Sequence, residues 1–304
     1  MPIHLPSLSR REFLKRAAVA GAAAALVPCA HAGLFGKSRD RHTFALLSDT
    51  HIAEDTAQVS RNVNMAEHLA AVSKELVELP RRPSAVIVNG DLALRTGLPG
   101  DYATFAGKID PIRAIAPVHL LLGNHDDREN FWKAFPKEAK AQHGATDRQV
   151  GVIRSDHANW FLLDSLDATD STPGELGTAQ LQWLGRKLDS HRNKPAVVVV
   201  HHNLGRDGSI AGLNDTSALE EMFARHRQIK AMVYGHTHDW KVTQHASGVH
   251  LVNLPPVAYI FKEGRPSGWV RATMERDSME IELRSLDPTH PQHGELWDLK
   301  WREG

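Results

Sequence analysis

Five short polar clusters in the sequence contain the residue types that bind divalent metals and move protons. They are Asp49-Thr50-His51, Gly90-Asp91, Gly123-Asn124-His125-Asp126, His201-His202 and Gly235-His236-Thr237-His238. The chain has 19 histidines against a single cysteine, so we expect imidazole and carboxylate ligands rather than thiolates. Together with one amide oxygen, such ligands suit Mn, Fe, Zn, Co or Ni better than Ca or Mg.

Each cluster follows an apolar run that is typical of a buried β-strand. These runs are Thr43–Leu47, Ala85–Val88, Val118–Leu122, Ala196–Val200 and Ala231–Tyr234. Ligands of open α/β sheets bind beyond the carboxyl ends of the strands, so clusters far apart in the sequence can converge on one crevice. In an extended segment residues i and i+2 point the same way, which lets Asp49 with His51, and His236 with His238, bind metal from one side.

Helical patterns alternate with the predicted strands. Apolar spacing predicts helices over Asn64–Leu79, over Thr178–Leu188 with Thr178 as its cap, and over Thr216–His226. Further strands are expected at Gly151–Ile153, Trp160–Leu163 and Val249–Val252, and an antiparallel hairpin at Gly268–Arg284 with its turn at Asp277-Ser278. The alternation predicts an α/β fold with a mixed sheet arrangement.

The order D-x-H, G-D, G-N-H-D, H-H, G-H-x-H between Asp49 and His238 resembles the calcineurin-like metallophosphoesterase family. This resemblance implies a four-layer α/β/β/α sandwich with two mixed sheets and two divalent metal ions at the strand ends. It also implies the ligands: Asp49, His51, Asp91 and His238 for one metal, and Asp91, Asn124, His201 and His236 for the second, with Asp91 bridging.

The resemblance implies hydrolysis of phosphate esters. Two metal ions can clamp a phosphoryl oxygen and lower the pKa of a bridging water to about 7, which supplies a hydroxide nucleophile. His125 would face the substrate and protonate the leaving oxygen, and Asp126 would hold its ring in the required tautomer.

Several residues outside this set are open to two interpretations. His202 is expected behind the ligands rather than among them, and Asp164 is interpreted as a turn residue after a buried strand. Arg95, Asn203, Arg206 and Tyr259 are either contacts for the phosphate or leaving group, or ordinary solvated or packed side chains. Members that resemble cyclic-nucleotide phosphodiesterases often carry an acid where this chain has Leu94, so the resemblance does not fix the substrate.

Charge limits the partners. Lys plus Arg and Asp plus Glu both number 36, which favours a small phosphoester substrate and gives no reason to expect nucleic-acid binding. The function is therefore predicted to be metal-dependent cleavage of a phosphomonoester or phosphodiester. The alternatives are a metal-dependent binding module without turnover and, among enzymes, a cyclic-nucleotide phosphodiesterase.

The N-terminus resembles a twin-arginine (Tat) signal peptide over residues 1–32. Ser9-Arg10-Arg11-Glu12-Phe13-Leu14-Lys15 precedes the apolar segment Ala17–Val27, which is too short to span a bilayer comfortably, and Ala30-His31-Ala32 fits a cleavage site. We expect Tat translocation machinery as a partner, a periplasmic or secreted location, and no stable membrane span after processing. A lipoprotein anchored at Cys29 is the less favoured interpretation, because Pro28 stands where a small residue is usual.

Residues 40–290 are the expected catalytic domain, and residues 291–304 are expected to form a C-terminal tail.

Overall fold

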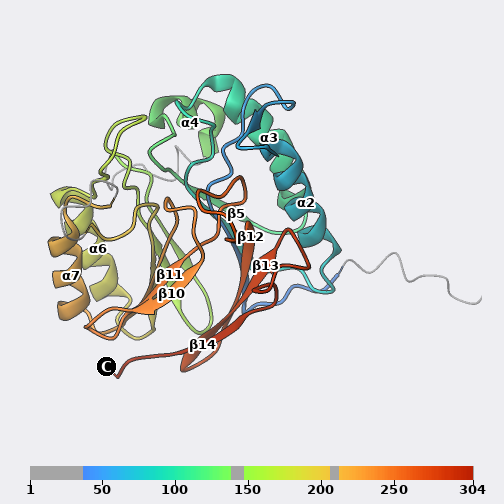
Figure 1. The fold of residues 1–304 in the computed structure, drawn as a ribbon. Coiled ribbons are helices and arrows are strands. Elements are labelled where there is room, and N and C mark those ends of the chain that lie inside the picture. Colours follow the sequence, from blue (N-terminus) through green and yellow to red (C-terminus); the bar gives the residue numbers. More distant parts are fainter. Residues whose placement is uncertain (1–36, 138–146, 206–211, 304) are drawn as a thin grey trace, which may run out of the picture. The chain divides into compact units, whose positions relative to one another are not determined.

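The structure is a computed structural model, and it describes residues 37–137, 147–205 and 212–303. In this part of the chain two mixed β-sheets lie face to face (Figure 1). The strands of the first sheet, in spatial order, are β14 (Leu296–Lys300), β13 (Ser278–Ser285), β12 (Gly268–Met274), β1 (Thr43–Leu47), β4 (Ala85–Asn89) and β5 (Val118–Leu121). Those of the second are β10 (Lys241–Gln244), β11 (His250–Asn253), β9 (Ile229–Tyr234), β8 (Ala196–Val199), β7 (Asn159–Leu162) and β6 (Gly151–Arg154). In the first sheet β1, β4 and β5 run parallel, and the pairings among β1, β12, β13 and β14 are antiparallel. In the second sheet β11, β9, β8 and β7 run parallel, and the edge strands β10 and β6 are antiparallel. The predicted mixed sheets are therefore confirmed.

Apolar side chains fill the space between the sheets, and helices cover the outer faces. Phe44 and Leu46 of β1 belong to the same buried cluster as Val197 and Val199 of β8. The covering helices are α2 (Met65–Glu78), α3 (Pro99–Arg113) and α4 (Arg128–Ala134) on the first sheet, and α6 (Thr178–Ser190) and α7 (Thr216–Arg225) on the second (Figure 1). The four-layer α/β/β/α architecture is therefore confirmed.

The helices follow the apolar spacing closely, but one predicted cap is wrong. In α2, Asn64 accepts a hydrogen bond from the backbone N–H of Glu67 at 3.0 Å, which caps the helix. In α6 the residue before the helix is Gly177, and it supplies no side-chain cap, so Thr178 is not the cap that we expected. Instead, the Asp215 carboxylate accepts hydrogen bonds from the backbone N–H groups of Leu176 and Gly177.

Three features of the first half of the chain were not predicted. Helix α3 buries Tyr102, Phe105, Ile109 and Ile112, which is helical spacing, but two prolines and two glycines within it obscure the pattern. Proline is well tolerated at the first position of a helix, where Pro99 lies. Helix α4 is a short seven-residue element, and β2 (Val59–Ser60) with β3 (Val63–Asn64) forms a small hairpin.

The segment that we expected to be a C-terminal tail belongs to the domain. Strand β14 pairs antiparallel with β13, and residues 39–304 form one unit. The Arg302 side chain is buried and donates hydrogen bonds to the carbonyls of Ile229, Ser247 and Phe223. Only one residue of β14 is buried, so its sequence lacks the apolar run by which the other strands were predicted.

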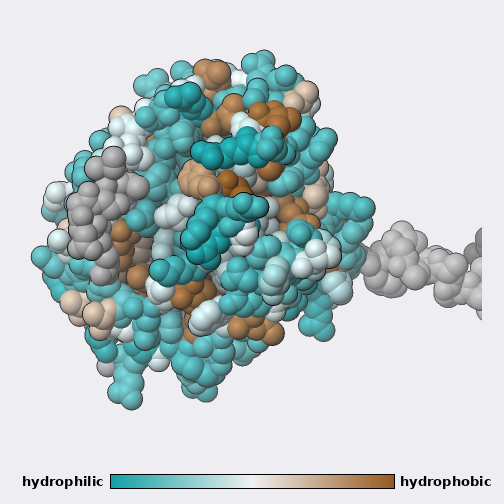
Figure 2. Space-filling model, in the orientation of Figure 1, coloured by the Kyte–Doolittle hydropathy of each residue, from teal (hydrophilic) through white to brown (hydrophobic). Residues whose placement is uncertain are grey.

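The predicted signal peptide, Cys29 and Arg206 lie outside the described residues. Among the helices that the structure describes, none is both long enough and apolar enough to cross a membrane. The face drawn in Figure 2 is mostly hydrophilic, with small apolar patches between the charged side chains.

Candidate active site

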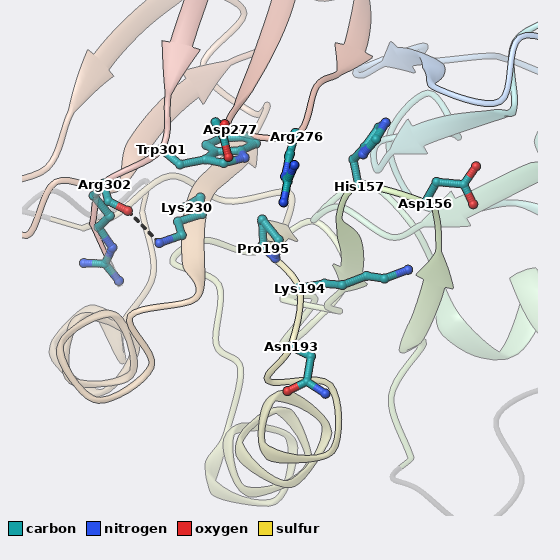
Figure 3. Close-up of a pocket in the computed structure, with 10 residues that line it drawn as sticks. All are labelled: Asp156, His157, Asn193, Lys194, Pro195, Lys230, Arg276, Asp277, Trp301 and Arg302. Atoms are coloured by element: carbon teal, nitrogen blue, oxygen red, sulfur yellow. Dashed lines mark hydrogen bonds between the residues drawn. The ribbon is translucent and has the colours of Figure 1, made fainter.

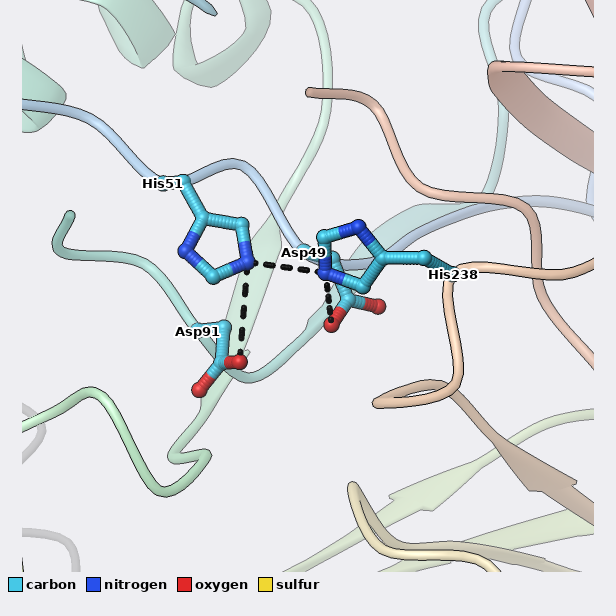
Figure 4. Close-up of side chains that lie close together, drawn as sticks. All are labelled: Asp49, His51, Asp91 and His238. Atoms are coloured by element: carbon cyan, nitrogen blue, oxygen red, sulfur yellow. Dashed lines mark hydrogen bonds and ion pairs between the residues drawn. The ribbon is translucent and has the colours of Figure 1, made fainter. Parts of the chain in front are cut away.

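Four buried side chains from the segments that follow β1, β4 and β9 meet in a first cluster (Figure 4). Their ligand atoms, one each from Asp49, His51, Asp91 and His238, all lie within 4.8 Å of one another. The Nε2 atoms of His51 and His238 are 3.0 Å apart. His51 Nε2 lies 3.6 Å from an Asp91 oxygen, and His238 Nε2 lies 3.5 Å from an Asp49 oxygen.

The tautomers of the two histidines show that this cluster fits a cation. Nδ1 of His51 contacts the carbonyl oxygen of Leu94 at 3.1 Å, and Nδ1 of His238 contacts that of Tyr259. A carbonyl can only accept, so each Nδ1 carries the proton and each neutral ring has its lone pair on Nε2. Burial lowers the pKa of His51 to about 4 and that of His238 well below its usual value, so both rings are neutral at pH 7. Two lone pairs then face each other at 3.0 Å beside two carboxylates, and a metal ion would relieve that repulsion.

A second cluster shares Asp91 with the first. Asp91, His201 and His236 bring one ligand atom each to within 4.8 Å of one another. Nδ1 of His201 donates to the Asn89 carbonyl at 2.8 Å, and its Nε2 faces an Asp91 oxygen at 3.3 Å. Asn124 is buried, and its Oδ1 has no hydrogen-bond partner among the described residues. An unpartnered amide oxygen in such a place fits a fourth metal ligand.

The pKa values of the buried acids and of His201 depend on one another's charges. Burial alone would raise the pKa of Asp91, but the neighbouring His201 lowers it well below the usual range. Burial opposes the charge on His201 as well, yet Asp91 raises the pKa of that imidazole to about 10. Burial raises the pKa of Asp49 to about 6. Without metal, a proton on His201 thus neutralises the buried Asp91 carboxylate, and a bound metal ion would take over that task.

The predicted ligands lie on strained backbone rather than on extended segments. Five of them have positive φ angles: Asp49 (54°), His51 (46°), Asp91 (48°), His236 (67°) and His238 (51°). This left-handed region costs residues other than glycine roughly 1–3 kcal/mol each, and such strain gathers at functional sites. The expectation that each D-x-H or H-x-H pair sits on an extended segment is therefore wrong. The chain has already left the strand at these residues, and the turns aim the side chains.

Close packing at Gly123 and Gly235 explains why glycine precedes two of the clusters. A Cβ on Gly123 would come within 2.2 Å of an Asp91 oxygen, and one on Gly235 within 2.0 Å of the Ser48 hydroxyl. Any side chain at either position would displace a neighbour of the site.

His125 and Asp126 lie where the sequence placed them, but they do not interact as expected. The Asp126 carboxylate accepts hydrogen bonds from the backbone N–H groups of Leu92, Ala93 and Gly123 and from the Tyr102 hydroxyl. Its role is therefore to hold the loops that carry Asp91 and Asn124, and its predicted role as the residue that orients His125 is corrected. Adjacent residues in this turn point in different directions, so sequence proximity was misleading.

The His125 ring is held instead by Arg95 and Asp170. Its Nδ1 lies 2.9 Å from the Arg95 carbonyl oxygen and 3.4 Å from an Asp170 oxygen. The second Asp170 oxygen faces the Arg95 guanidinium at 3.4 Å. Sequence analysis missed Asp170, because it lies in a loop without a motif. The His125 side chain is about one quarter exposed (27%), so it is accessible to solvent.

Three further residues that the sequence singled out, His202, Asp164 and Asn203, form hydrogen bonds or ion pairs with other residues. His202 bonds the Ser165 hydroxyl at 2.8 Å through Nδ1, and its ring centroid lies 4.5 Å from that of His236. Asp164 is buried and pairs with Arg128 at 2.8 Å, outside both clusters. The Asn203 amide donates to the Leu204 carbonyl.

Two aromatic rings stack on histidines of the first cluster, those of Tyr259 and Phe261. Only Tyr259 was a candidate from the sequence. The Tyr259 ring stacks on His51 at 5.1 Å between centroids, and Phe261 stacks on His238 at 4.0 Å. Phe261 is 53% exposed. The guanidinium of Arg61, at the tip of the β2–β3 hairpin, lies 5.0 Å from the Phe261 centroid. Phe261 and Arg61 carry no motif, so their place could not be found from the sequence.

Comparison with known proteins agrees with this geometry. A family model described as calcineurin-like phosphoesterase matches residues 42–240. The chain is 27% identical over 198 residues to the cAMP/cGMP dual specificity phosphodiesterase of Mycobacterium tuberculosis, an alignment that covers 63% of this chain and 60% of that protein. It is 29% identical over 199 residues to the 3′,5′-cyclic adenosine monophosphate phosphodiesterase of Pseudomonas aeruginosa, covering 63% and 68%. It is 26% identical over 232 residues to the glycerophosphodiester phosphodiesterase of Enterobacter lignolyticus, covering 73% and 81%.

Solved structures share the fold. A dimetal phosphatase from Danio rerio superposes with a TM-score of 0.64 at 16% identity, covering 86% of this chain and 99% of that one. A purple acid phosphatase from yellow lupin superposes with a TM-score of 0.61 at 15% identity, covering 87% and 54%.

The four-layer fold and the paired Asp/His clusters define a class of enzyme, the metal-dependent phosphoester hydrolases. Within that class the chain belongs to the calcineurin-like phosphoesterase family.

Proposed function

We propose that the protein is a phosphodiesterase whose substrate carries an organic group on each side of the phosphate. The observation that carries the proposal is the pair of clusters joined by Asp91, with His125 beside them and the exposed ring of Phe261 stacked on His238. The curated relatives described above are all named as phosphodiesterases. The exposed face of Phe261 and the nearby ring of Tyr259 offer apolar contact to a second organic group, which a monoester lacks.

The residues present fit two divalent ions. Asp49, His51, Asp91 and His238 would hold one, and Asp91, Asn124, His201 and His236 the other. Bound there, the ions would act as Lewis acids toward the phosphate and lower the pKa of a water molecule to about 7. Their identity, among Mn, Fe, Zn, Co and Ni, stays a prediction from the ligand types.

The chain's own residues deliver a proton to the leaving group. Because Nδ1 of His125 contacts a carbonyl oxygen, that nitrogen keeps its hydrogen in either charge state. The proton that the ring can exchange is thus the one on Nε2. Asp170, 3.4 Å from Nδ1, helps to hold the ring so that Nε2 can give this proton to a leaving oxygen.

The proposal is tested by the hydrolysis of bis-nitrophenyl phosphate and nitrophenyl phosphate. We expect the wild-type protein to cleave the diester faster. His125→Ala should lower kcat by about 10²- to 10⁴-fold, the usual contribution of an acid–base residue, and keep its metal. Asp91→Ala should lose both metal and activity. Full activity in His125→Ala, or faster monoester cleavage by the wild type, would count against the proposal.

We also propose export by the twin-arginine route, which rests on Arg10, Arg11 and the apolar segment Ala17–Val27. The test is cell fractionation of the wild type and of a variant with Arg10→Lys and Arg11→Lys. The wild type should be found outside the cytoplasm, and the variant inside. Equal export of both proteins would refute the route.

A further inference from the structure

A cavity of about 810 Å³ lies at the amino-terminal ends of strands in the second sheet, whereas the metal clusters lie at the carboxyl ends. Strands β7, β8 and β9 are parallel. The metal clusters follow the ends of β8 and β9, whereas the cavity is lined by residues that precede β7 and β8 or begin β9: Asp156, His157, Asn193, Lys194, Pro195 and Lys230. The β12–β13 turn adds Arg276 and Asp277, and the C-terminal segment adds Trp301 and Arg302 (Figure 3).

Two of the lining cations are buried, and their partners are neutral. Lys230 is 7% exposed, and its ammonium group donates to the Arg302 carbonyl at 2.6 Å (Figure 3). Arg302 is 9% exposed and donates only to backbone carbonyls, among them that of Ile229. Arg227, just outside the cavity, also donates to carbonyls. None of these carbonyls carries a formal charge, although those of Phe223 and His226 form the partly negative C-terminal end of α7, so the three groups keep a net positive charge.

No acid neutralises this group within the part of the chain that the structure describes. None of the three cations has a carboxylate oxygen within 4.0 Å among residues 37–137, 147–205 and 212–303. Burial lowers the pKa of Lys230, and the charges of Arg302 and Arg227 lower it further. Arg227 is exposed, but Lys230 and Arg302 are like charges held together in a poorly solvated place, and such a pair attracts an anion.

The exposed part of the cavity lining carries two cations and two acids. Lys194 and Arg276 add two more cations, and Figure 3 shows the Arg276 side chain extending into the cavity. Of the two acids in the lining, Asp156 is already paired with Arg41 at 3.2 Å. Asp277 is exposed, as are Lys194 and Arg276, so solvent screens all three charges, and the net positive charge of the cavity lining comes from Lys230 and Arg302. The indole N–H of Trp301 is a further donor without an acceptor among the described residues.

We infer that this cavity binds a small phosphorylated anion at a site separate from the metal centre. Its volume suits a ligand of the size of a sugar phosphate or a nucleotide. Arg276 comes from the first sheet and Lys230 from the second, so the bound anion bridges the two sheets. The ligand therefore stabilises the folded chain, because it binds the native state alone.

The test uses the full-length, metal-loaded protein and inorganic phosphate as the probe. Titration calorimetry of the wild type should show a class of phosphate site besides any at the metals. The double variant Lys194→Ala/Arg276→Ala removes two exposed cations and should bind at that class at least tenfold more weakly. Its kcat/KM for bis-nitrophenyl phosphate should stay within twofold of the wild type. Lys230→Met probes the buried cation, and the exposed pair keeps the test valid if that variant does not fold.

The matched control is Lys74→Ala/Lys133→Ala, which removes two exposed lysines from α2 and α4. It should bind phosphate as the wild type does. Unchanged binding in Lys194→Ala/Arg276→Ala would overturn the inference. Equal weakening in the control would also overturn it, because the effect would then be one of net charge.

Discussion

At the scale of single residues, three of the predicted metal ligands have the same hydrogen-bonding pattern. His51, His201 and His238 each use Nδ1 to contact a backbone carbonyl, which fixes both the ring orientation and the tautomer. The sequence predicted these histidines from their types and spacing. It could not predict the pattern, because the three carbonyls, from Leu94, Asn89 and Tyr259, lie outside the motifs.

Asp170 lies beside the His125 ring, although no motif in the sequence indicated it. We predict that Asp170→Asn lowers kcat for bis-nitrophenyl phosphate about tenfold with little change in KM, because His125 loses the carboxylate contact that helps to hold its ring. Steady-state kinetics check this. Asp167→Asn, which changes a nearby exposed acid paired with Arg148, should behave as the wild type. Equal loss in both variants would mean that the effect is only one of loop structure.

At the scale of elements, the strands could be predicted and the turns after them could not. Apolar runs such as Ala85–Val88 predict buried strands because the helices and the second sheet must cover both of their faces. The left-handed turns at Asp49 and Asp91 depend on contacts between strands, such as the hydrogen bond from the Asp49 N–H to the Gly90 carbonyl. Helix α3 was missed although its apolar spacing is regular, since Pro99 and Pro111 suggested breaks.

The turn after β5 gives a sharp prediction. Gly123→Ala should lose most bound metal and at least about 100-fold in activity, because the new methyl group would overlap Asp91 and His201. Elemental analysis and kinetics on one sample check this. Gly107→Ala, in α3 with nothing within 4 Å of the added group, should keep full activity and gain up to about 1 kcal/mol in stability. Normal metal content in Gly123→Ala would contradict the packing described here.

At the scale of the whole domain, the metal clusters join the two sheets. Asp49, Asp91 and Asn124 follow strands of the first sheet, whereas His201, His236 and His238 follow strands of the second. The sequence predicted this convergence from the family resemblance and from the rule for strand ends. The place of β14 in the first sheet could not be predicted, because its exposed side chains give no strand pattern.

The most direct test of a centre for two metals is a titration of metal-free protein with Mn²⁺ that follows bis-nitrophenyl phosphate hydrolysis. Both clusters share Asp91, so we expect activity only when both are filled. Turnover should rise with added metal and reach its maximum at about two ions per chain. A maximum at one ion per chain, or turnover that does not depend on metal, would contradict the two-metal centre.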